Sequence, residues 1–292
     1  MSTDSVTRRF LLENLDIRGQ VVCLTDVWQA IAARRDYAPA VRTLLGEFAA
    51  VSVMVGAGLK HPGRALLQVS GPGPIRMLVA DCTDGLALRG MIRMDDGVAG
   101  KGPASLPELI GESRLALTIE NATSGQMYQS IVPVEGITVA EVFEQFLDRS
   151  EQVPTHLWID STEASVTALI LQKLPRADAR DPDGWARVQL QAAAGFRARP
   201  IAGVAKGGGG SSSDIEDILG TLFPCDDIRL YEPREVKDGC RRNEEKVIAM
   251  LRSLGREEVE AAIAEQGEVV VHDEICNQEY RFGPAAVSAI LG

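Results

Sequence analysis

Positive charge, histidine and aromatic side chains are all scarce in this sequence. Lys and Arg together number 30 against 41 Asp and Glu, which gives a formal net charge of −11. Nucleic acids and anionic membranes are bound through clustered positive charge, so neither is an expected partner. Apolar residues still make up 45% and charged residues 24%, which is typical of a folded globular protein.

Long apolar runs are also absent. The N-terminal "MSTDSVTRRF" lacks the apolar centre of a signal peptide. The most apolar stretch, 41–59, contains Arg42 and Glu47, and its uncharged remainder is shorter than the roughly 20 residues that span a bilayer. We therefore expect a cytoplasmic protein that is neither exported nor inserted into a membrane.

Cysteine is too sparse and scattered for the disulfide framework of a small secreted domain, so mostly reduced thiols are expected. The five cysteines are Cys23, Cys82, Cys225, Cys240 and Cys276.

Catalytic patterns are missing as well. His61, His156 and His272 are isolated in the sequence and match no catalytic triad or HExxH metal motif. A thiol oxidoreductase normally needs a C-x-x-C pair with a lowered thiol pKa, and the sequence has no such pair. The sequence therefore predicts a protein that is not an enzyme.

Residues 1–176 are predicted to form an α+β domain, in which a β-sheet covers buried helices. Apolar residues recur at three- and four-residue spacing through 39–59, which predicts a helix that is apolar on most sides and hence buried. Thr138 and Glu141 have capping-box spacing before an amphipathic helix. Strand-like runs are predicted at 65–70, 75–82, 86–94, 114–120, 127–134, 155–160 and 166–174.

Two further segments follow that domain. Residues 177–232 carry weak helix signals and a Gly/Ser run, which predicts a partly helical, partly flexible linker. Residues 233–292 predict a small α+β tail domain, with a helix capped by Asn243 and a last helix opened by Pro284.

The tail has the frame of a zinc-binding knuckle with half of its ligands. A four-thiolate zinc site uses two close cysteines on each of two turns. The stretches "KDGCRRNEEKV" (237–247) and "VVVHDEICNQEYRF" (269–282) each carry one cysteine where such a turn would carry two.

Several stretches are similar to a known family, from about Phe10 to Leu291. They include "IRGQVV" (17–22), "DYAPAVRTLLGEFAAVSVMVGAGLK" (36–60), "MYQSIVPVEG" (127–136), "RSEQVPTHLWI" (149–159) and "EEVEAAIAEQGEVVVHDEIC" (257–276). On these motifs the chain resembles the 33-kilodalton chaperonin family, also called the heat-shock protein 33 family.

The resemblance implies a redox-regulated, ATP-independent holdase of the stress response that binds unfolding proteins. Family members hold one zinc through C-x-C and C-x-x-C pairs, but here Arg242 and Asp273 stand at two of the four ligand positions. Zinc would need Cys240 and Cys276 together with Asp273 or His272. We expect it to be held poorly, because Arg242 adds a fixed positive charge beside a cation.

The resemblance also implies that the four ligand positions converge. A salt bridge between Arg242 and Asp273, with or without a disulfide between Cys240 and Cys276, would then occupy the place of zinc. The alternative is two unrelated losses that leave both thiols free. In either case the family's switch, in which oxidation joins each close cysteine pair and unfolds the tail, cannot operate in the same way.

The expected partners are unfolded or misfolded client proteins, and a homodimer is left open. Client binding is assigned to apolar side chains of the linker when that segment detaches; in the resting state they would pack on the first domain. These side chains are Trp185, Val188, Leu190, Phe196 and Ile201. The rival function is a non-enzymatic protein-interaction module that keeps the fold and has lost zinc and redox regulation.

Overall fold

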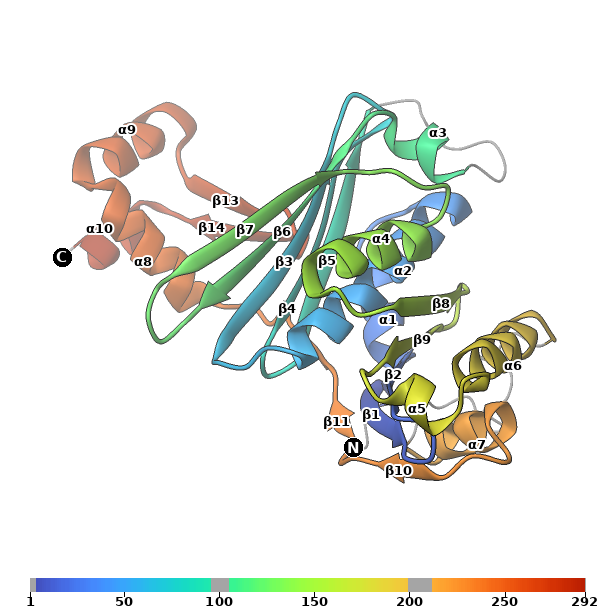
Figure 1. Cartoon of the computed structure of the whole chain (residues 1–292). Coiled ribbons are helices and arrows are strands. Elements are labelled where there is room, and N and C mark those ends of the chain that lie inside the picture. Colours follow the sequence, from blue (N-terminus) through green and yellow to red (C-terminus); the bar gives the residue numbers. More distant parts are fainter. Residues whose placement is uncertain (1–3, 96–104, 199–211, 292) are drawn as a thin grey trace. The chain divides into compact units, whose positions relative to one another are not determined.

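The computed structural model describes residues 4–95, 105–198 and 212–291. The chain divides into two compact units, 1–239 and 240–292. Both units combine helices with strands (Figure 1), which confirms the α+β prediction. In the structure the boundary between the two units lies between Gly239 and Cys240. The three-part division with boundaries at 176 and 232 stays a prediction.

The first unit contains two sheets. In the first sheet the strand order is β10-β1-β2-β9-β8, and β11 also pairs with β1. Its longer strands pair antiparallel and bury apolar side chains on both faces, because helices cover each side. The strands are β1 (Val6–Leu12), β2 (Ile17–Leu24), β8 (Thr155–Ser161), β9 (Val166–Lys173), β10 (Ile228–Leu230) and β11 (Arg234–Glu235).

The second sheet has the order β12-β5-β4-β3-β6-β7. Its longer strands are antiparallel neighbours, and β12 joins the sheet by parallel pairing with β5. The strands are β3 (Gly63–Ser70), β4 (Ile75–Thr83), β5 (Ala87–Met94), β6 (Arg114–Asn121), β7 (Met127–Pro133) and β12 (Lys237–Asp238). The strand β7 therefore forms one edge of this sheet.

Helix α2 (Pro39–Ala57) joins the two sheets, because it packs against strands of both. Pro39 stands at its first position, where proline's missing N–H is not needed. A Cβ at Gly46 would collide with Ser161 and Val166, so the glycine lets the first sheet approach closely. By length and composition α2 could cross a membrane, yet 72% of that stretch is buried in the protein, which is typical of a core helix.

Shorter helices complete this core, namely α1 (Asp26–Ala32), α3 (Leu106–Ile110) and α4 (Val139–Glu151). The Thr138 hydroxyl accepts a hydrogen bond from Glu141 N (3.2 Å) at the start of α4, as predicted. The Glu141 carboxylate accepts from Ile137 N (2.8 Å) rather than from the cap residue itself. In the capping box of α4, the backbone N–H that donates to the Glu141 carboxylate is therefore that of the residue before the cap.

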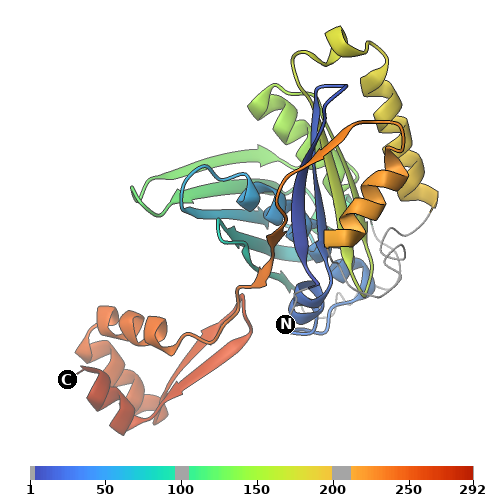
Figure 2. The same ribbon diagram turned by 90° about the horizontal axis from the view of Figure 1, so that it is seen from below.

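The described part of 177–232 packs on the other face of the first sheet (Figures 1 and 2). Its helices are α5 (Ala177–Arg180), α6 (Gly184–Ala198) and α7 (Ser212–Leu222), while β10 of the same segment is a strand of the sheet itself. Apolar side chains of α6 and α7 share a core with β1, β2 and β9, and this core includes Val188, Leu219 and Phe10. This segment thus belongs to the first unit in the structure.

The second unit has its own small core, built from three helices and a hairpin. Asn243 caps α8 through a hydrogen bond from Lys246 N (2.9 Å), and Gly255 ends that helix with a φ of +95°, as the sequence predicted. The elements are α8 (Glu244–Leu254), α9 (Arg256–Gln266), β13 (Val269–Asp273), β14 (Gln278–Phe282) and α10 (Pro284–Leu291).

Candidate functional site

Cys240 and Cys276 form a disulfide within the second unit, with Cα atoms 5.3 Å apart. Cys276 lies in the hairpin turn, where Asp273 pairs with Gln278 across four intervening residues. Asn277 adopts a left-handed φ of +51°, which asparagine tolerates better than most residues. Both cysteines are buried, so the hairpin turn is joined covalently to the segment that leads into α8.

The predicted salt bridge between Arg242 and Asp273 is wrong. The guanidinium carbon of Arg242 lies 4.5 Å from the centre of the Tyr280 ring, a cation–π contact. The Asp273 carboxylate instead accepts a hydrogen bond from Cys276 N (3.0 Å) and so closes the hairpin turn. Among the described residues, no ion pair joins Arg242 to Asp273, and each of the two side chains has a different partner.

Tyr280 connects the hairpin to the segment around Cys240. Its hydroxyl accepts a hydrogen bond from Asn243 N (3.1 Å) and donates one to the side-chain oxygen of Gln278 (3.0 Å). The Gln278 amide in turn donates to the backbone oxygen of Cys240 (2.8 Å). This chain of polar contacts holds the two cysteine-bearing segments together beside the disulfide.

The candidate client-binding residues on α6 face two directions. Val188 is fully buried in the core, and Trp185 and Phe196 are partly buried against it. Leu190 is 72% exposed, so it faces away from the sheet. Ile201 lies outside the described residues.

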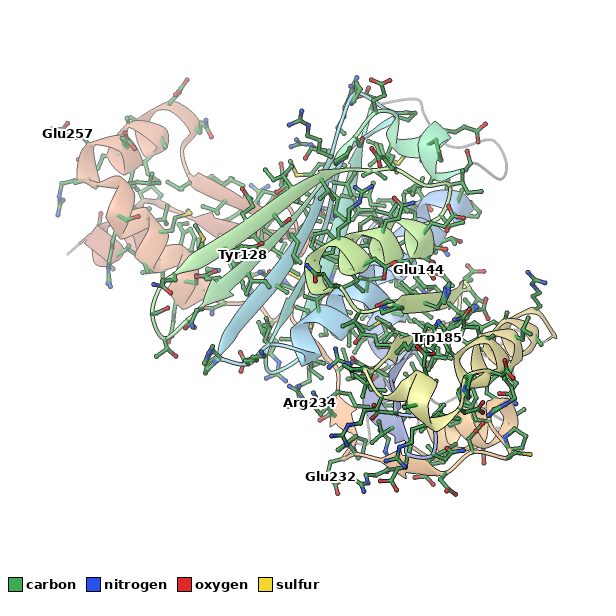
Figure 3. All side chains as sticks on the ribbon, in the orientation of Figure 1. Tyr128, Glu144, Trp185, Glu232, Arg234 and Glu257 are labelled. Carbon is green, nitrogen blue, oxygen red and sulfur yellow. A yellow bond between two sulfur atoms is a disulfide. The ribbon has the colours of Figure 1, made fainter. Side chains whose placement is uncertain are left out.

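Aromatic rings of β8 hold α6 against the first sheet. His156 stacks on Trp185 with ring centres 5.8 Å apart, and Trp158 lies 6.5 Å from Phe196. Figure 3 shows Trp185 on α6 and Glu144 on α4. Aromatic contacts of this kind stabilise a packed state only modestly, so α6 is held by a limited set of rings and its buried apolar face.

His156 takes part in the contact between β8 and α6, which sequence reasoning did not foresee. Its Nδ1 lies 3.2 Å from a carboxylate oxygen of Glu144 on α4. This hydrogen bond raises the pKa of His156, while partial burial acts against it. The alternation of polar and apolar residues along 155–160 could have placed the histidine on a strand face, but not beside Trp185.

Comparison with known proteins identifies the family of this fold. A family model described as Hsp33 protein matches residues 5–283. The chain belongs to the Hsp33 family. A 33 kDa chaperonin of Methylobacillus flagellatus is 34% identical over 276 residues, which cover 94% of this chain and 90% of that protein.

Two further relatives agree with this assignment. A 33 kDa chaperonin of Nitrosococcus oceani is 36% identical over 275 residues, covering 94% of this chain and 90% of that protein. The crystal structure of the 33 kDa chaperonin, a heat shock protein 33 homolog, from Thermotoga maritima has a TM-score of 0.76. It is 20% identical and covers 98% of this chain and 97% of its own, so it supports the Hsp33 fold.

The tail of this Hsp33-family chain does not fit a zinc ion. Both candidate thiols are bonded to each other, and the Asp273 carboxylate is used by the turn. His272 is exposed and points to the opposite face of β13 from Asp273, since side chains alternate along a strand. Within the described ranges, no group of three or more His, Cys, Asp or Glu side chains could hold a metal ion.

We therefore expect less than one zinc per chain. Structural zinc sites use four protein ligands, and the disulfide withdraws both sulfurs from this one. The measurement is metal content together with a thiol count, on protein dialysed against a mild chelator without reducing agent. Protein reduced and then incubated with zinc is the control, and one firmly held zinc per untreated chain contradicts the prediction.

The remaining three cysteines lie in the first unit and are not in disulfides. Burial raises the pKa of the Cys82 thiol to about 12, so it stays protonated and unreactive. Cys225 is exposed. Cys225 therefore offers a matched control for thiol chemistry outside the second unit.

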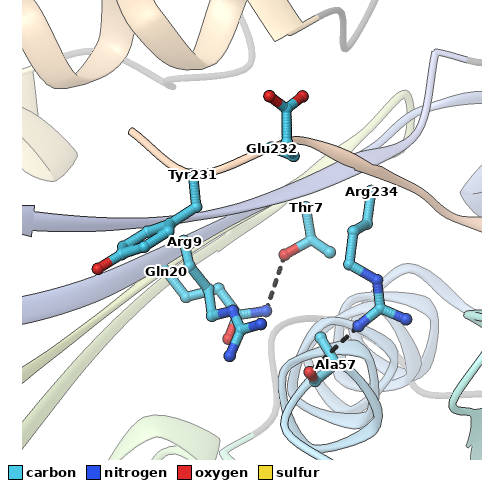
Figure 4. A pocket seen from close by; sticks show the side chains of 7 residues that line it. All are labelled: Thr7, Arg9, Gln20, Ala57, Tyr231, Glu232 and Arg234. Atoms are coloured by element: carbon cyan, nitrogen blue, oxygen red, sulfur yellow. Dashed lines mark hydrogen bonds between the residues drawn. The ribbon is translucent and has the colours of Figure 1, made fainter. Parts of the chain in front are cut away.

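A pocket of about 300 Å³ lies where the segment 231–234 passes β1 and β2 near the end of α2 (Figure 4). Arg234, one of the two arginines that line it, donates to the carbonyl oxygens of Ala57 (3.2 Å) and Asp84. Because a helix C-terminus carries partial negative charge, this contact stabilises both α2 and the segment that crosses it. The pocket thus marks where 231–234 is fastened to the first unit.

Proposed function

We propose that the chain is an ATP-independent holdase chaperone, which binds unfolding proteins and prevents their aggregation. The observation that carries the proposal is the Hsp33 family match over residues 5–283, with relatives named 33 kDa chaperonin. The scarcity of catalytic patterns in the sequence agrees with a binding protein rather than an enzyme. We place the activity in the cytoplasm.

The proposed client-binding surface is the apolar face of α6, released when the 177–232 segment leaves the first sheet. Trp185, Val188 and Phe196 lie on this face, and Leu190 adds an apolar group that is already exposed. Exposed contiguous apolar surface is what recognises unfolded chains. In this proposal residues 1–176 form the domain on which α6 packs, and residues 233–292 form a domain that regulates its release.

The proposal is tested by light scattering from a heat-denatured client in the presence of the purified chain, with and without peroxide. Suppression of scattering in stoichiometric amounts supports it. A chain that leaves the scattering unchanged under both conditions favours the rival function, a protein-interaction module without chaperone activity. This alternative function is tested because Arg242 and Asp273 stand at two positions where the family has zinc ligands.

The substitution His156→Ala is expected to loosen α6 and to increase client binding. Removing the stack on Trp185 should shift the docking equilibrium of α6 by about two- to tenfold toward release, given the usual strength of an aromatic pair. Limited proteolysis of 184–198 and the client assay report the two effects. Leu190→Ser is the control for the proteolysis alone, because an exposed side chain can be lost without freeing the helix. Unchanged cleavage of α6 in His156→Ala would contradict the expectation.

A further inference from the structure

The edge strand β7 combines exposed apolar side chains with a lack of charge. Met127 is 71% exposed, Tyr128 64% and Ile131 55%. The stretch 127–134 reads MYQSIVPV and contains no Lys, Arg, Asp or Glu. Natural edge strands are usually protected by charged residues, bulges or a covering element, so an edge of this length and composition is unusual.

The backbone groups that face outward from β7 follow from its pairing with β6. Asn121 N donates to Gln126 O (2.9 Å) and Val134 N donates to Ser113 O (3.0 Å), which fixes the even-numbered positions as those bonded to β6. Bonded and unbonded positions alternate in an antiparallel pair. The N–H groups of Met127, Gln129 and Ile131 therefore point away from the sheet, together with their carbonyl groups.

The other long edge in this unit is protected differently. In the first sheet, β8 is flanked by α4 and α6, whereas the opposite edge is the three-residue strand β10. Pro133 is the single residue of β7 with a protective role, since its missing N–H ends the row of outward donors. Figure 3 shows Tyr128 on this strand.

We propose that β7 binds an extended segment of an unfolded client protein as an additional β-strand. This inference rests on the holdase function proposed above and adds a second contact, distinct from α6. An extended chain is the partner that satisfies alternating N–H and C=O groups in a row. Its alternate side chains would pack on Met127 and Ile131 on one face and on Tyr128 on the other, since side chains alternate along a strand.

A second copy of the chain fits this edge poorly. Two paired β7 strands of seven residues each fall well below the roughly 20–30 residues per partner that a stable interface uses. The net charge of −11 also makes two copies repel each other. An extended, neutral or basic client segment avoids this charge repulsion, and a chaperone contact with a client does not need the area of a stable dimer.

The test uses two double variants of the full chain. Met127→Pro/Ile131→Pro removes two outward donors while leaving the β6 pairing intact, and Met127→Ala/Ile131→Ala removes the same apolar side chains but keeps the donors. We expect the proline variant to bind clients about tenfold more weakly than the alanine variant, from two lost hydrogen bonds. Equal binding by the two variants, both with wild-type thermal midpoints, overturns the inference.

A peptide experiment on the wild-type chain covers the case in which the proline variant does not fold. The probe is a short peptide of alternating valine and threonine with a lysine at each end, compared with its copy N-methylated at alternate residues. We expect the methylated peptide to bind about tenfold or more weakly, because it lacks donors on one edge. Equal binding of the two peptides overturns the inference.

Two outcomes separate this inference from the proposed function. A wild-type chain that fails to suppress client aggregation refutes the holdase function and, with it, the role of β7. A chain that suppresses aggregation equally well in the proline and alanine variants refutes the role of β7 alone. A wild-type dimer that dissociates in the proline variant would make a second copy the occupant and also overturns the proposal.

Discussion

Reduction of the Cys240–Cys276 disulfide is expected to destabilise the second unit and to leave chaperone activity intact or increased. The bond closes a loop with a sequence separation of 36, so it should stabilise the folded unit by about 3–4 kcal/mol on the chain-entropy model. Oxidation then locks this unit. The resemblance implies a family switch in which oxidation releases zinc and unfolds the tail, so the redox response of this chain is expected to have the opposite sign.

The measurement is hydrogen exchange of residues 240–291 within the full chain, in peroxide and in dithiothreitol. In the oxidised protein, amide hydrogens that exchange only when the unit unfolds are expected to exchange up to a few hundredfold more slowly than in the reduced protein. Cys276→Ser should remove the difference, and Cys225→Ser, which changes an exposed thiol of the first unit, should retain it.

Client assays under the same two conditions complete this test. Client binding should be equal in peroxide and dithiothreitol, or higher in dithiothreitol, because forming the disulfide exposes no apolar surface. Faster exchange of 240–291 after oxidation, with a matching gain in client binding, would show that the site works in the opposite sense.

Glu47→Gln is expected to stabilise the first unit at neutral and alkaline pH. Glu47 lies on α2, and partial burial in that core raises its pKa from 4.5 to about 7. Loss of hydration penalises the ionised carboxylate, so the folded state holds its proton more tightly than the unfolded chain does. Glutamine has nearly the same shape and never ionises.

The sign of the pH dependence follows from proton binding. Well below pH 4.5 the carboxyl is neutral in both states, and the two proteins should be equally stable. As pH rises toward 7 the folded wild type holds more protons than the unfolded chain, so its free energy of unfolding falls. Above that pH the deficit should level off at about 3 kcal/mol, because each unit of the shift from 4.5 to about 7 is worth about 1.4 kcal/mol.

Urea unfolding of both proteins at several pH values between 4 and 8.5 measures this difference. Glu112→Gln is the matched control, because Glu112 is exposed and its loss should change the stability little at any pH. A constant difference between wild type and Glu47→Gln across the whole range would contradict the assignment to this carboxyl.

The sequence alone determined the local elements and the family of this protein. Periodic apolar residues and Pro39 define α2, and Asn243 and Pro284 define helix starts in the second unit. These features depend on neighbours within one or two turns of the chain, so the signals are complete in the sequence. The motifs along 17–276 were likewise sufficient for the Hsp33 assignment, which the family match confirms.

Tertiary structure decided the site. The sequence left open whether Cys240 and Cys276 are paired or free. Their pairing depends on the register of the β13–β14 hairpin, which positions Cys276, 36 residues after Cys240 in the chain. One of the sequence's two alternatives paired Arg242 with Asp273, whereas the structure places Arg242 on Tyr280. Charge signs predict that two side chains can attract each other, but only packing decides which partner is closer.

The position of α6 shows the same limit. Its apolar residues were recognisable in the sequence, but the contact of Trp185 with His156 joins a helix to a strand from a different part of the chain. The outward row of donors on β7 also depends on the strand order, which sets β7 at an edge. Sequence patterns specify which face of an element is apolar; the fold specifies what, if anything, covers that face, because the contacts that bury it come from residues far apart in the chain.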